Sequence, residues 1–496
     1  MHGDAPHISH RVVDHFPHVV GVEGVDTGSA QRSGASMDIE ITEEFQAVID
    51  LALEGKSLLI TGGAGTGKTT LLRVLRQALE ESGRSVVVAA PTGAAAIVAE
   101  GGTLHRTFGL SRTEHLTSMS YSPPPYARNV ITELDTLIID EFSMVSSMLL
   151  DQVANLLRRY NGLRAARSHD LEPFAKAFGY AQVILIGDPF QLPPVTTSHD
   201  RTVLADFNFA SEWWLHAKSW CTQGLVHVAL TKPFRQSNPT YLHALNAVRR
   251  VKATDDDLQL LNGRYQEADV DLDPNRFTYL VATNDQQEQI NAAQLASLQA
   301  PLYTHRAHVE YLVEGGRIPD GRTIPEVLFI KVGARVVMTT NEYGDEGTVW
   351  INGSNGEILE IYEAHGEVTQ VVVALDSGVI ATVVPHEFKH YQPVSVDDTR
   401  GGVMRRRVKM VHVATTKQFP FVLGWAMTIH KSQGKTLGSV ALDLTRRPFT
   451  SGHLYVGISR CRDLDDLILL GGVIEPDFLY PTHPAVAAYY DEHFTA

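Results

Sequence analysis

The sequence predicts an α/β fold made of two parallel-sheet units, with a small β-rich segment inserted in the second unit. Three observations support this prediction. Apolar runs of strand length alternate with helical patterns in the first half of the chain, which is typical of a parallel sheet buried on both faces. The alternation resumes at Phe277–Ala282. Between about 325 and 420 it gives way to short β-rich runs separated by glycine and asparagine turns.

Length and composition limit the protein class. The chain has 496 residues, more than a single core usually organises, so we expect two or more domains. No run approaches the ~18 apolar residues of a membrane span, so we expect no membrane partner. A net charge of −15 argues against coating nucleic acid with the whole surface, but it permits a local basic groove. The two cysteines, Cys221 and Cys461, argue against a disulfide framework or a cysteine zinc site.

The predicted helix and strands of the first unit follow an N-terminal leader of 38 residues. Residues 1–38 lack a secretory signal and show no periodicity, so we expect them to be disordered. A helix is predicted over 41–56, with Thr42 as its N-cap. The buried strands that follow are predicted at Ser57–Thr61, Ser85–Ala90, Thr136–Asp140 and Gln182–Gly187.

The run GGAGTGKT, starting at Gly62, lies between a predicted strand and a helix and matches the phosphate-loop pattern G-x-x-x-x-G-K-[ST]. Its backbone N–H groups would surround a β-phosphate, helped by the helix dipole. Lys68 would reach the β- and γ-phosphates, and the Thr69 hydroxyl would bind Mg²⁺. A chance glycine-rich turn would not also supply the strand and the helix. The residues expected to hold the nucleotide are Gly62, Gly63, Ala64, Gly65, Thr66, Gly67, Lys68, Thr69 and Thr70.

Two carboxylates end the predicted strand before Phe142. Asp140 would hold Mg²⁺, mostly through water, and Glu141 would polarise the attacking water as the general base. The alternative is a pair of acids that simply face solvent. Gln191, after a third strand, could contact the γ-phosphate. ATP is favoured as the nucleotide because the Asn-Lys-x-Asp loop that reads guanine is absent from the sequence.

Further motifs identify a family. PTGAAA, GGTLH, IIDEFSM, IGDPFQLPPV, FRQ, WAMTIHKSQGKTL and LYVGISRCR follow the phosphate loop in a fixed order. With them the sequence resembles a superfamily 1 DNA helicase of the petite-integration-frequency (Pif) type, related to RecD, from about Ile41 to Gly472. The resemblance implies two RecA-like cores that bind ATP between them, 39–230 and 231–330 with 420–496. It also implies an SH3-like insertion at 331–419 and a pin-like insertion at about 104–130.

The resemblance assigns further roles. Arg235 and Arg460 would approach the γ-phosphate as arginine fingers, with structural ion pairs as the alternative. Gln46 would read adenine, although it stands one place away from the family position. Phe108 and Tyr121 could stack on bases, and core packing is the alternative for Phe108. The residues expected to grip DNA phosphates are Pro91, Thr92, Gly93 and His105 on the first core, and Thr428, His430, Lys431, Ser432, Gln433 and Gly434 on the second.

These roles describe an ATP-dependent helicase that moves along single-stranded DNA and unwinds duplex at a junction, in the 5′→3′ direction that the family implies. The alternative is a DNA-stimulated ATPase subunit of a recombination or nuclease complex, without unwinding of its own. We expect a monomer, cytoplasmic and nucleoid-associated, of bacterial or phage type, with replication or recombination proteins as partners.

A zinc hydrolase is a third interpretation. It would rest on the H-E-x-x-H pattern at His386–His390, which needs a helix. Pro385 and strand-like neighbours favour coincidence.

Overall fold

The computed structural model describes residues 41–494 apart from 111–115, 119, 162–177, 221–223, 271, 274–275, 314–323, 345–346, 401–402 and 448–449. The predicted leader and part of the predicted pin therefore lie outside the described residues. The chain from Glu43 onward forms one contact unit. None of the described helices combines the length and the hydropathy that crossing a membrane requires.

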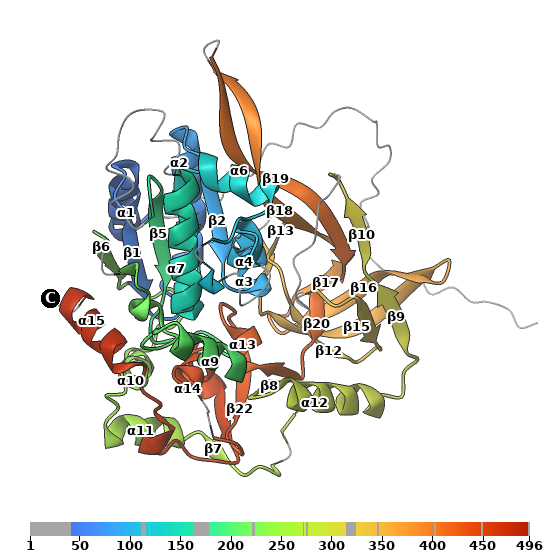
Figure 1. Ribbon diagram of the computed structural model, residues 1–496. Coiled ribbons are helices and arrows are strands. Elements are labelled where there is room, and N and C mark those ends of the chain that lie inside the picture. Colours follow the sequence, from blue (N-terminus) through green and yellow to red (C-terminus); the bar gives the residue numbers. More distant parts are fainter. Residues whose placement is uncertain are drawn as a thin grey trace, which may run out of the picture. The chain divides into compact units, whose positions relative to one another are not determined.

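Six parallel strands form the first sheet, in the order β3-β2-β4-β5-β1-β6 (Figure 1). Four of them coincide with the predicted strands to within a residue or two, which confirms the α/β expectation for this half. The strands are β1 (Leu58–Gly62), β2 (Val86–Ala90), β3 (Gly102–Thr103), β4 (Thr136–Ile139), β5 (Gln182–Gly187) and β6 (Val226–Leu230).

Helices bury both faces of this sheet because alternate strand residues point to opposite sides. Leu58 and Ile60 of β1 join a core with helices α1 (Glu43–Leu53) and α2 (Lys68–Glu81), whereas Leu59 joins a second core. That second core takes in helices α6 (Pro125–Glu133) and α7 (Ser147–Leu156), the latter continuing as the π-helix η2 (Leu157–Asn161). This two-sided burial explains why the central strands β1, β2, β4 and β5 are mostly apolar.

A second parallel sheet has the order β21-β8-β22-β23-β7. Its strands come from both sides of the β-rich segment, as the sequence predicts for an inserted unit. The strands are β7 (Tyr265–Gln266), β8 (Phe277–Val281), β21 (Ala426–Thr428), β22 (Ser439–Asp443) and β23 (Leu467–Leu470). The helices that follow or cover them are α10 (Pro239–Arg249), α11 (Asp255–Asn262), α12 (Asn284–Ser297), α13 (Ile429–Ser432) and α14 (His453–Ile458).

The strands of the inserted segment pair antiparallel. Strand β9 (Tyr303–Arg306), which lies before the β-rich stretch in the sequence, pairs with β11 (Val327–Ile330). A five-stranded sheet of order β17-β16-β15-β12-β20 follows. Its SH3-like character and the proposed domain boundaries stay predictions. The remaining strands are β10 (His308–Tyr311), β12 (Arg335–Met338), β13 (Glu342–Gly344), β14 (Gly347–Trp350), β15 (Asn355–Ala364), β16 (Glu367–Leu375), β17 (Ile380–Val383), β18 (His386–Arg400), β19 (Val403–Gln418) and β20 (Phe421–Leu423).

The hairpin of β18 and β19 extends past its own sheet toward the first core (Figure 1). It lies beside α6, and the Val408 N–H donates to the Ser85 hydroxyl at 3.2 Å. The H-E-x-x-H residues lie in β18 and so are part of a strand, where His386 and His390 cannot have the one-turn helical spacing that the zinc chemistry requires.

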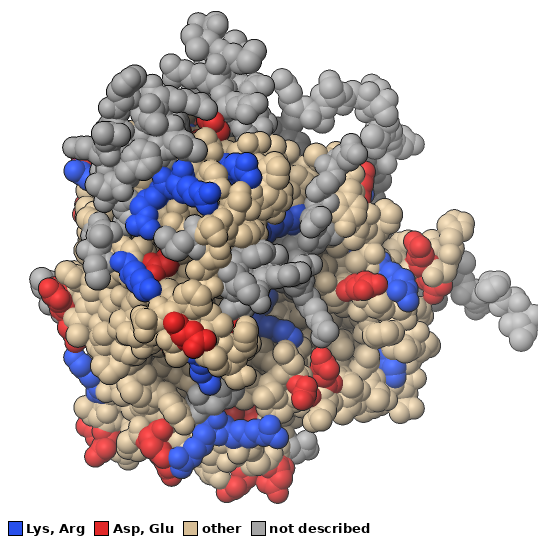
Figure 2. All heavy atoms as spheres, viewed as in Figure 1, with Lys and Arg blue, Asp and Glu red and all other residues tan. Residues whose placement is uncertain are grey.

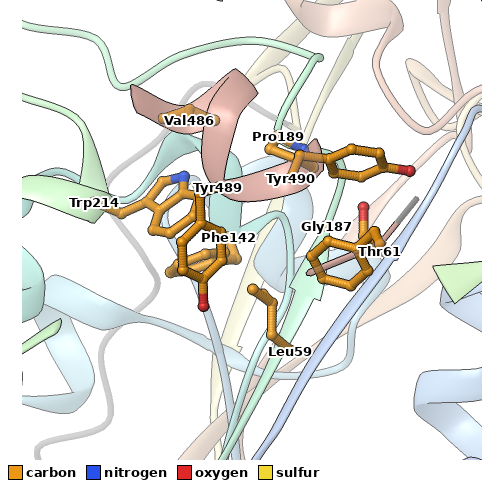
Figure 3. Close-up of a pocket in the computed structure, with 10 residues that line it drawn as sticks. Leu59, Thr61, Phe142, Gly187, Pro189, Trp214, Val486, Tyr489 and Tyr490 are labelled. Atoms are coloured by element: carbon orange, nitrogen blue, oxygen red, sulfur yellow. The ribbon is translucent and has the colours of Figure 1, made fainter. Parts of the chain in front are cut away.

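The last described helix, α15 (Pro484–Phe494), returns to the first sheet. Figure 3 shows its Tyr489 and Tyr490 across a narrow, mostly apolar cavity from Phe142 and Gly187. Tyr489 also packs edge-on against Trp214, with ring centroids 5.8 Å apart. A segment that follows the second sheet therefore completes the cover of the first.

Candidate nucleotide-binding site

The phosphate loop connects β1 to α2 as predicted. Gly65 and Gly67 have φ of 79° and 81°, a left-handed conformation that glycine adopts without strain. The Lys68 ammonium donates to the carbonyl oxygens of Gly62 and Gly63, both at 2.8 Å. Burial lowers the pKa of Lys68, against the opposing effect of nearby carboxylates. The loop and the first turn of α2 thus form the cradle that a nucleotide phosphate requires.

Asp140 and Glu141 follow β4 and face the same loop. Burial, followed by the charge of Glu141, raises the pKa of Asp140 to about 7. Burial also raises the pKa of Glu141, whereas the charges of Lys68 and Arg460 lower it. Glu141 has φ 48° and ψ 44°, a conformation that costs a non-glycine residue on the order of 1–3 kcal/mol. The strained backbone holds this carboxylate at the edge of the sheet, beside Lys68.

Residues beyond the first sheet reach the phosphate loop. The Ala64 N–H donates to the Tyr455 hydroxyl of α14 at 2.8 Å. Arg235 Nη1 donates to the Ser459 carbonyl at 3.2 Å, and its Cβ is adjacent to Gly65. Burial, then the charge of Arg460, lowers the pKa of Arg235 to about 9. The structure thus brings Arg235 to the loop, as the resemblance implied, and adds Tyr455.

A buried ion pair lies next to this contact. The Arg249 guanidinium at the end of α10 contacts Asp188 through Nε and Nη2, the latter at 2.8 Å. Gln191 is 4 % exposed, and its Nε2 donates to Asp188 Oδ2 at 3.2 Å. Gly452 lies so close that a Cβ would be 2.2 Å from the Gln191 carbonyl oxygen. Gln191 is therefore placed where the loop after β5 meets the start of α14.

Arg460 is 1 % exposed and donates four hydrogen bonds. Nε contacts the Val456 carbonyl at 2.7 Å, Nη1 the Ser432 and Lys435 carbonyls at 3.2 Å each, and Nη2 the Ser459 hydroxyl at 2.8 Å. Among the described residues neither Arg460 nor Arg235 forms an ion pair within 4.0 Å. The structure therefore does not support the ion-pair alternative in its described part.

The loop after β21 differs from the prediction in three residues. The Thr428 hydroxyl accepts from the Lys431 N–H as the N-cap of α13, and the Ser432 hydroxyl donates to the Ile429 carbonyl at 2.7 Å. Both side chains are buried, so these hydroxyls shape the loop instead of facing a DNA backbone. Gln433 points to the nucleotide side, where its Nε2 donates to Glu141 Oε2 at 3.0 Å.

Other residues of the predicted DNA grips are partly or fully accessible. His430 is half-buried and Gly434 is exposed, as is Lys431, whose Nζ donates to Gln287 at 3.0 Å. On the first core Pro91 and Gly93 are half-buried beside Thr92, which caps α3 (Gly93–Val98) through its hydroxyl.

Of the remaining candidates, two are exposed and one is buried. His105, on α4 (Leu104–Thr107), is exposed. Gln46 is exposed on α1 and donates to Asp50 at 2.8 Å, while its neighbour Phe45 packs against Gly67, so adenine reading by Gln46 stays a prediction. Phe108 is fully buried in the core of the first sheet. Of its two alternatives, it therefore packs in the core and does not stack on DNA bases.

On the face shown in Figure 2, the charges of the described residues do not outline a DNA path. On the face shown in Figure 2, lysine and arginine side chains form small groups with acidic residues among them. This interspersion agrees with the net charge of −15. Any contacts to a DNA backbone on this face would therefore come from a few local groups.

Sequence reasoning missed three participants: Tyr455, Arg249 and Asp188. Both Tyr455 and Asp188 lie in motifs that it quoted, LYVGISR and IGDPFQ, but the partner of each side chain is far away in the sequence. Arg249 stands in the basic pair RR, which gives no sign of its burial. Only the tertiary arrangement identifies these contacts.

Comparisons with known proteins agree on one family. A family model described as PIF1-like helicase matches residues 37–264. A relative from Bdellovibrio bacteriovorus, named ATP-dependent DNA helicase Pif1, is 30 % identical over 89 % of this chain and 92 % of its own length. The crystal structure of Bacteroides sp Pif1 in complex with ADP-AlF4 matches with a TM-score of 0.76 at 29 % identity, covering 92 % of this chain and 98 % of that one. Bacteroides Pif1 bound to ssDNA matches with a TM-score of 0.59 over the same shares and at the same identity.

Proposed function

The chain belongs to the PIF1-like helicase family and is an ATP-dependent DNA helicase, and we propose that it moves along single-stranded DNA in the 5′→3′ direction. Relatives bound to an ATP analogue and to single-stranded DNA support the use of both ligands. The direction rests on the family resemblance.

One observation carries the proposed coupling: the phosphate loop of the first sheet is contacted by α14 of the second, through Ala64 and Tyr455 at 2.8 Å. Arg235 and Arg460 both bond to Ser459, the residue that caps the end of α14. A nucleotide held by the loop would thus affect residues of both sheets. A change in their separation during hydrolysis would displace one DNA grip relative to the other.

The donor set fits ATP with Mg²⁺. The Thr69 hydroxyl and the Asp140 carboxylate are hard oxygen ligands. Mg²⁺ is usually bound by a small number of such protein oxygens together with the substrate phosphates. Bound there, Mg²⁺ would neutralise phosphate charge. Lys68 would exchange its bonds to the loop carbonyls for phosphate oxygens.

The residues at the reacting end are Glu141 and the two arginines. Glu141 would take the proton of the attacking water. Burial raises its pKa, and the charges of Lys68 and Arg460 oppose that rise. Arg460 and Arg235 would stabilise charge on the transferred phosphoryl group, a role of roughly 10³–10⁵ in rate in other nucleotide hydrolases. Gln191 would orient the γ-phosphate from the loop after β5.

ATP turnover with and without single-stranded DNA tests the motor. We expect strong stimulation by DNA, and we expect duplexes with a 5′ tail to unwind faster than duplexes with a 3′ tail. Stimulated turnover without unwinding of either substrate would favour the alternative, an ATPase subunit of a larger complex. Faster unwinding of the 3′-tailed substrate would overturn the direction alone. A monomeric state, a bacterial or phage origin, a place at the nucleoid, and replication or recombination partners stay predictions.

A further inference from the structure

Gln433 connects the second sheet to the residues that would act on the γ-phosphate. Its Nε2 donates to Glu141 Oε2 at 3.0 Å and to Gln191 Oε1 at 3.2 Å. One side-chain amide therefore uses both of its N–H groups on two residues of the first core.

The loop that carries Gln433 also holds Arg460 and presents an exposed lysine. The preceding residue, Ser432, accepts Arg460 Nη1 through its carbonyl, and so does Lys435. Lys431, two residues before Gln433, is exposed. A displacement of this short loop by DNA would move the Gln433 amide and the carbonyls that hold Arg460 together.

We propose that Gln433 is a positioning residue that makes ATP hydrolysis depend on the position of the 428–434 loop, and hence on DNA. The proposal rests on the proposed function. The amide holds one oxygen of Glu141 and leaves the other for the attacking water. It also fixes the Gln191 side chain, whose own amide nitrogen is taken by Asp188.

The surroundings favour this role over a DNA contact. Gln433 is half-buried and its amide nitrogen is bonded to Glu141 and Gln191, whereas a residue that binds DNA phosphates must direct its donors outward. The charged groups around Glu141 are Lys68, Arg460, Asp188 and Asp140. Of these four groups, only Arg460 is hydrogen-bonded to the loop that carries Gln433, through the Ser432 and Lys435 carbonyls. Among the described residues, Gln433 and Arg460 are therefore the two links from this loop to Glu141.

The first experiment is a steady-state comparison of Gln433→Ala with the parent at saturating single-stranded DNA. We expect kcat to fall by roughly tenfold, because the base and Gln191 lose their common partner, with KM for ATP and the half-saturating DNA concentration within about twofold. Gln433→Asn keeps the amide on a side chain one methylene shorter, so kcat should fall in this variant too. Gln299→Ala, an exposed glutamine after α12, is the matched control and should behave as the parent.

The second experiment does not depend on turnover. Fluorescence anisotropy gives the affinity for single-stranded DNA with and without ADP–aluminium fluoride. In the parent the analogue should change that affinity, and in Gln433→Ala the ratio should move toward one, because coupling between two sites is reciprocal.

Three results would overturn the inference. Parental kcat and coupling in Gln433→Ala would make the residue a bystander. A DNA affinity about tenfold weaker, with parental kcat at saturating DNA, would restore it as a DNA contact. A parent enzyme that DNA does not stimulate would refute the proposed function, and the inference with it. That last failure appears in the parent and the first two only in the variant, so they are distinguishable.

Discussion

The backbone N–H of Ala64 and the phenol oxygen of Tyr455 are joined by a 2.8 Å hydrogen bond between the phosphate loop and α14. Tyr455 is 3 % exposed, and burial raises its pKa to about 12, so the phenol is protonated at neutral pH. A neutral hydroxyl can accept from the amide and still donate.

The first prediction concerns this bond. Tyr455→Phe should lower the free energy of unfolding by about 1–3 kcal/mol, because the Ala64 N–H loses its acceptor in a buried position. Urea denaturation followed by circular dichroism measures the loss. Tyr480→Phe removes a hydroxyl from an exposed tyrosine and should change little. Equal losses in the two variants would show that the Ala64 amide finds another partner.

The second prediction concerns the proposed base. Glu141→Gln should bind ATP and DNA with near-parental affinity while kcat falls by roughly 10²–10⁴, because the amide cannot accept a proton. Turnover and nucleotide affinity, measured separately, test this. Glu54→Gln, at an exposed site after α1, is the control. Near-normal turnover in Glu141→Gln would remove Glu141 from its role.

The third prediction concerns the buried ion pair of Asp188 and Arg249. Arg249→Met leaves the Asp188 carboxylate buried without its cation and should cost about 3–5 kcal/mol of unfolding free energy. The double variant Asp188→Asn with Arg249→Met should cost less than the sum of the single changes. A double-mutant cycle in urea measures the difference, and strict additivity would mean that the pair is energetically independent.

The fourth prediction separates charge from structure at Arg460. Arg460→Ala should lower both kcat and stability, because the guanidinium donates to three carbonyl groups and one hydroxyl. Arg460→Lys keeps the charge but not the fork of donors, so it should recover part of the stability and little of the rate. Thermal unfolding and single-turnover hydrolysis give the two quantities. A stable Arg460→Ala variant with parental kcat would contradict a role as an arginine finger.

The fifth prediction is a pH dependence at the long hairpin. His390 is 4 % exposed, and its Nε2 lies 2.8 Å from the Thr416 hydroxyl. Burial, then the charges of Arg106 and His412, lowers the pKa of His390 to about 4. The unfolded chain therefore binds a proton first as the pH falls. The contribution of neutral, buried His390 to the free energy of unfolding is complete above about pH 6.5. It is lost toward pH 4, by up to about 1.4 kcal/mol per pH unit.

Unfolding free energies at several pH values between 4 and 7.5 test this dependence. His390→Gln should reduce the slope of unfolding free energy against pH in that range. A residual slope is expected from His453, whose pKa burial lowers to about 3. An unchanged slope in His390→Gln would show that His390 titrates normally in the folded protein.

The sequence predicts the site best where the chemistry is local. The phosphate loop and the acids at the end of β4 are contiguous motifs beside buried strands, and the structure places Lys68 near both acids. Thr428 and Ser432 show the limit of this reasoning. A hydroxyl that suits a phosphate also suits the cap of a short helix, and only the burial of both side chains distinguishes the two. Gln433, Tyr455 and Arg249 depend on partners in other elements, which spacing along the chain does not reveal.

The return of α15 to the first sheet has a consequence for synthesis on the ribosome. Trp214 and Leu59 of the first core share a cluster with Val486, so this core cannot bury all of its apolar surface until the segment around Val486 has emerged. At about 5–20 residues per second, the nascent chain leaves that surface uncovered for many seconds. Chaperones that bind exposed aromatic surface could bind the nascent chain during this interval.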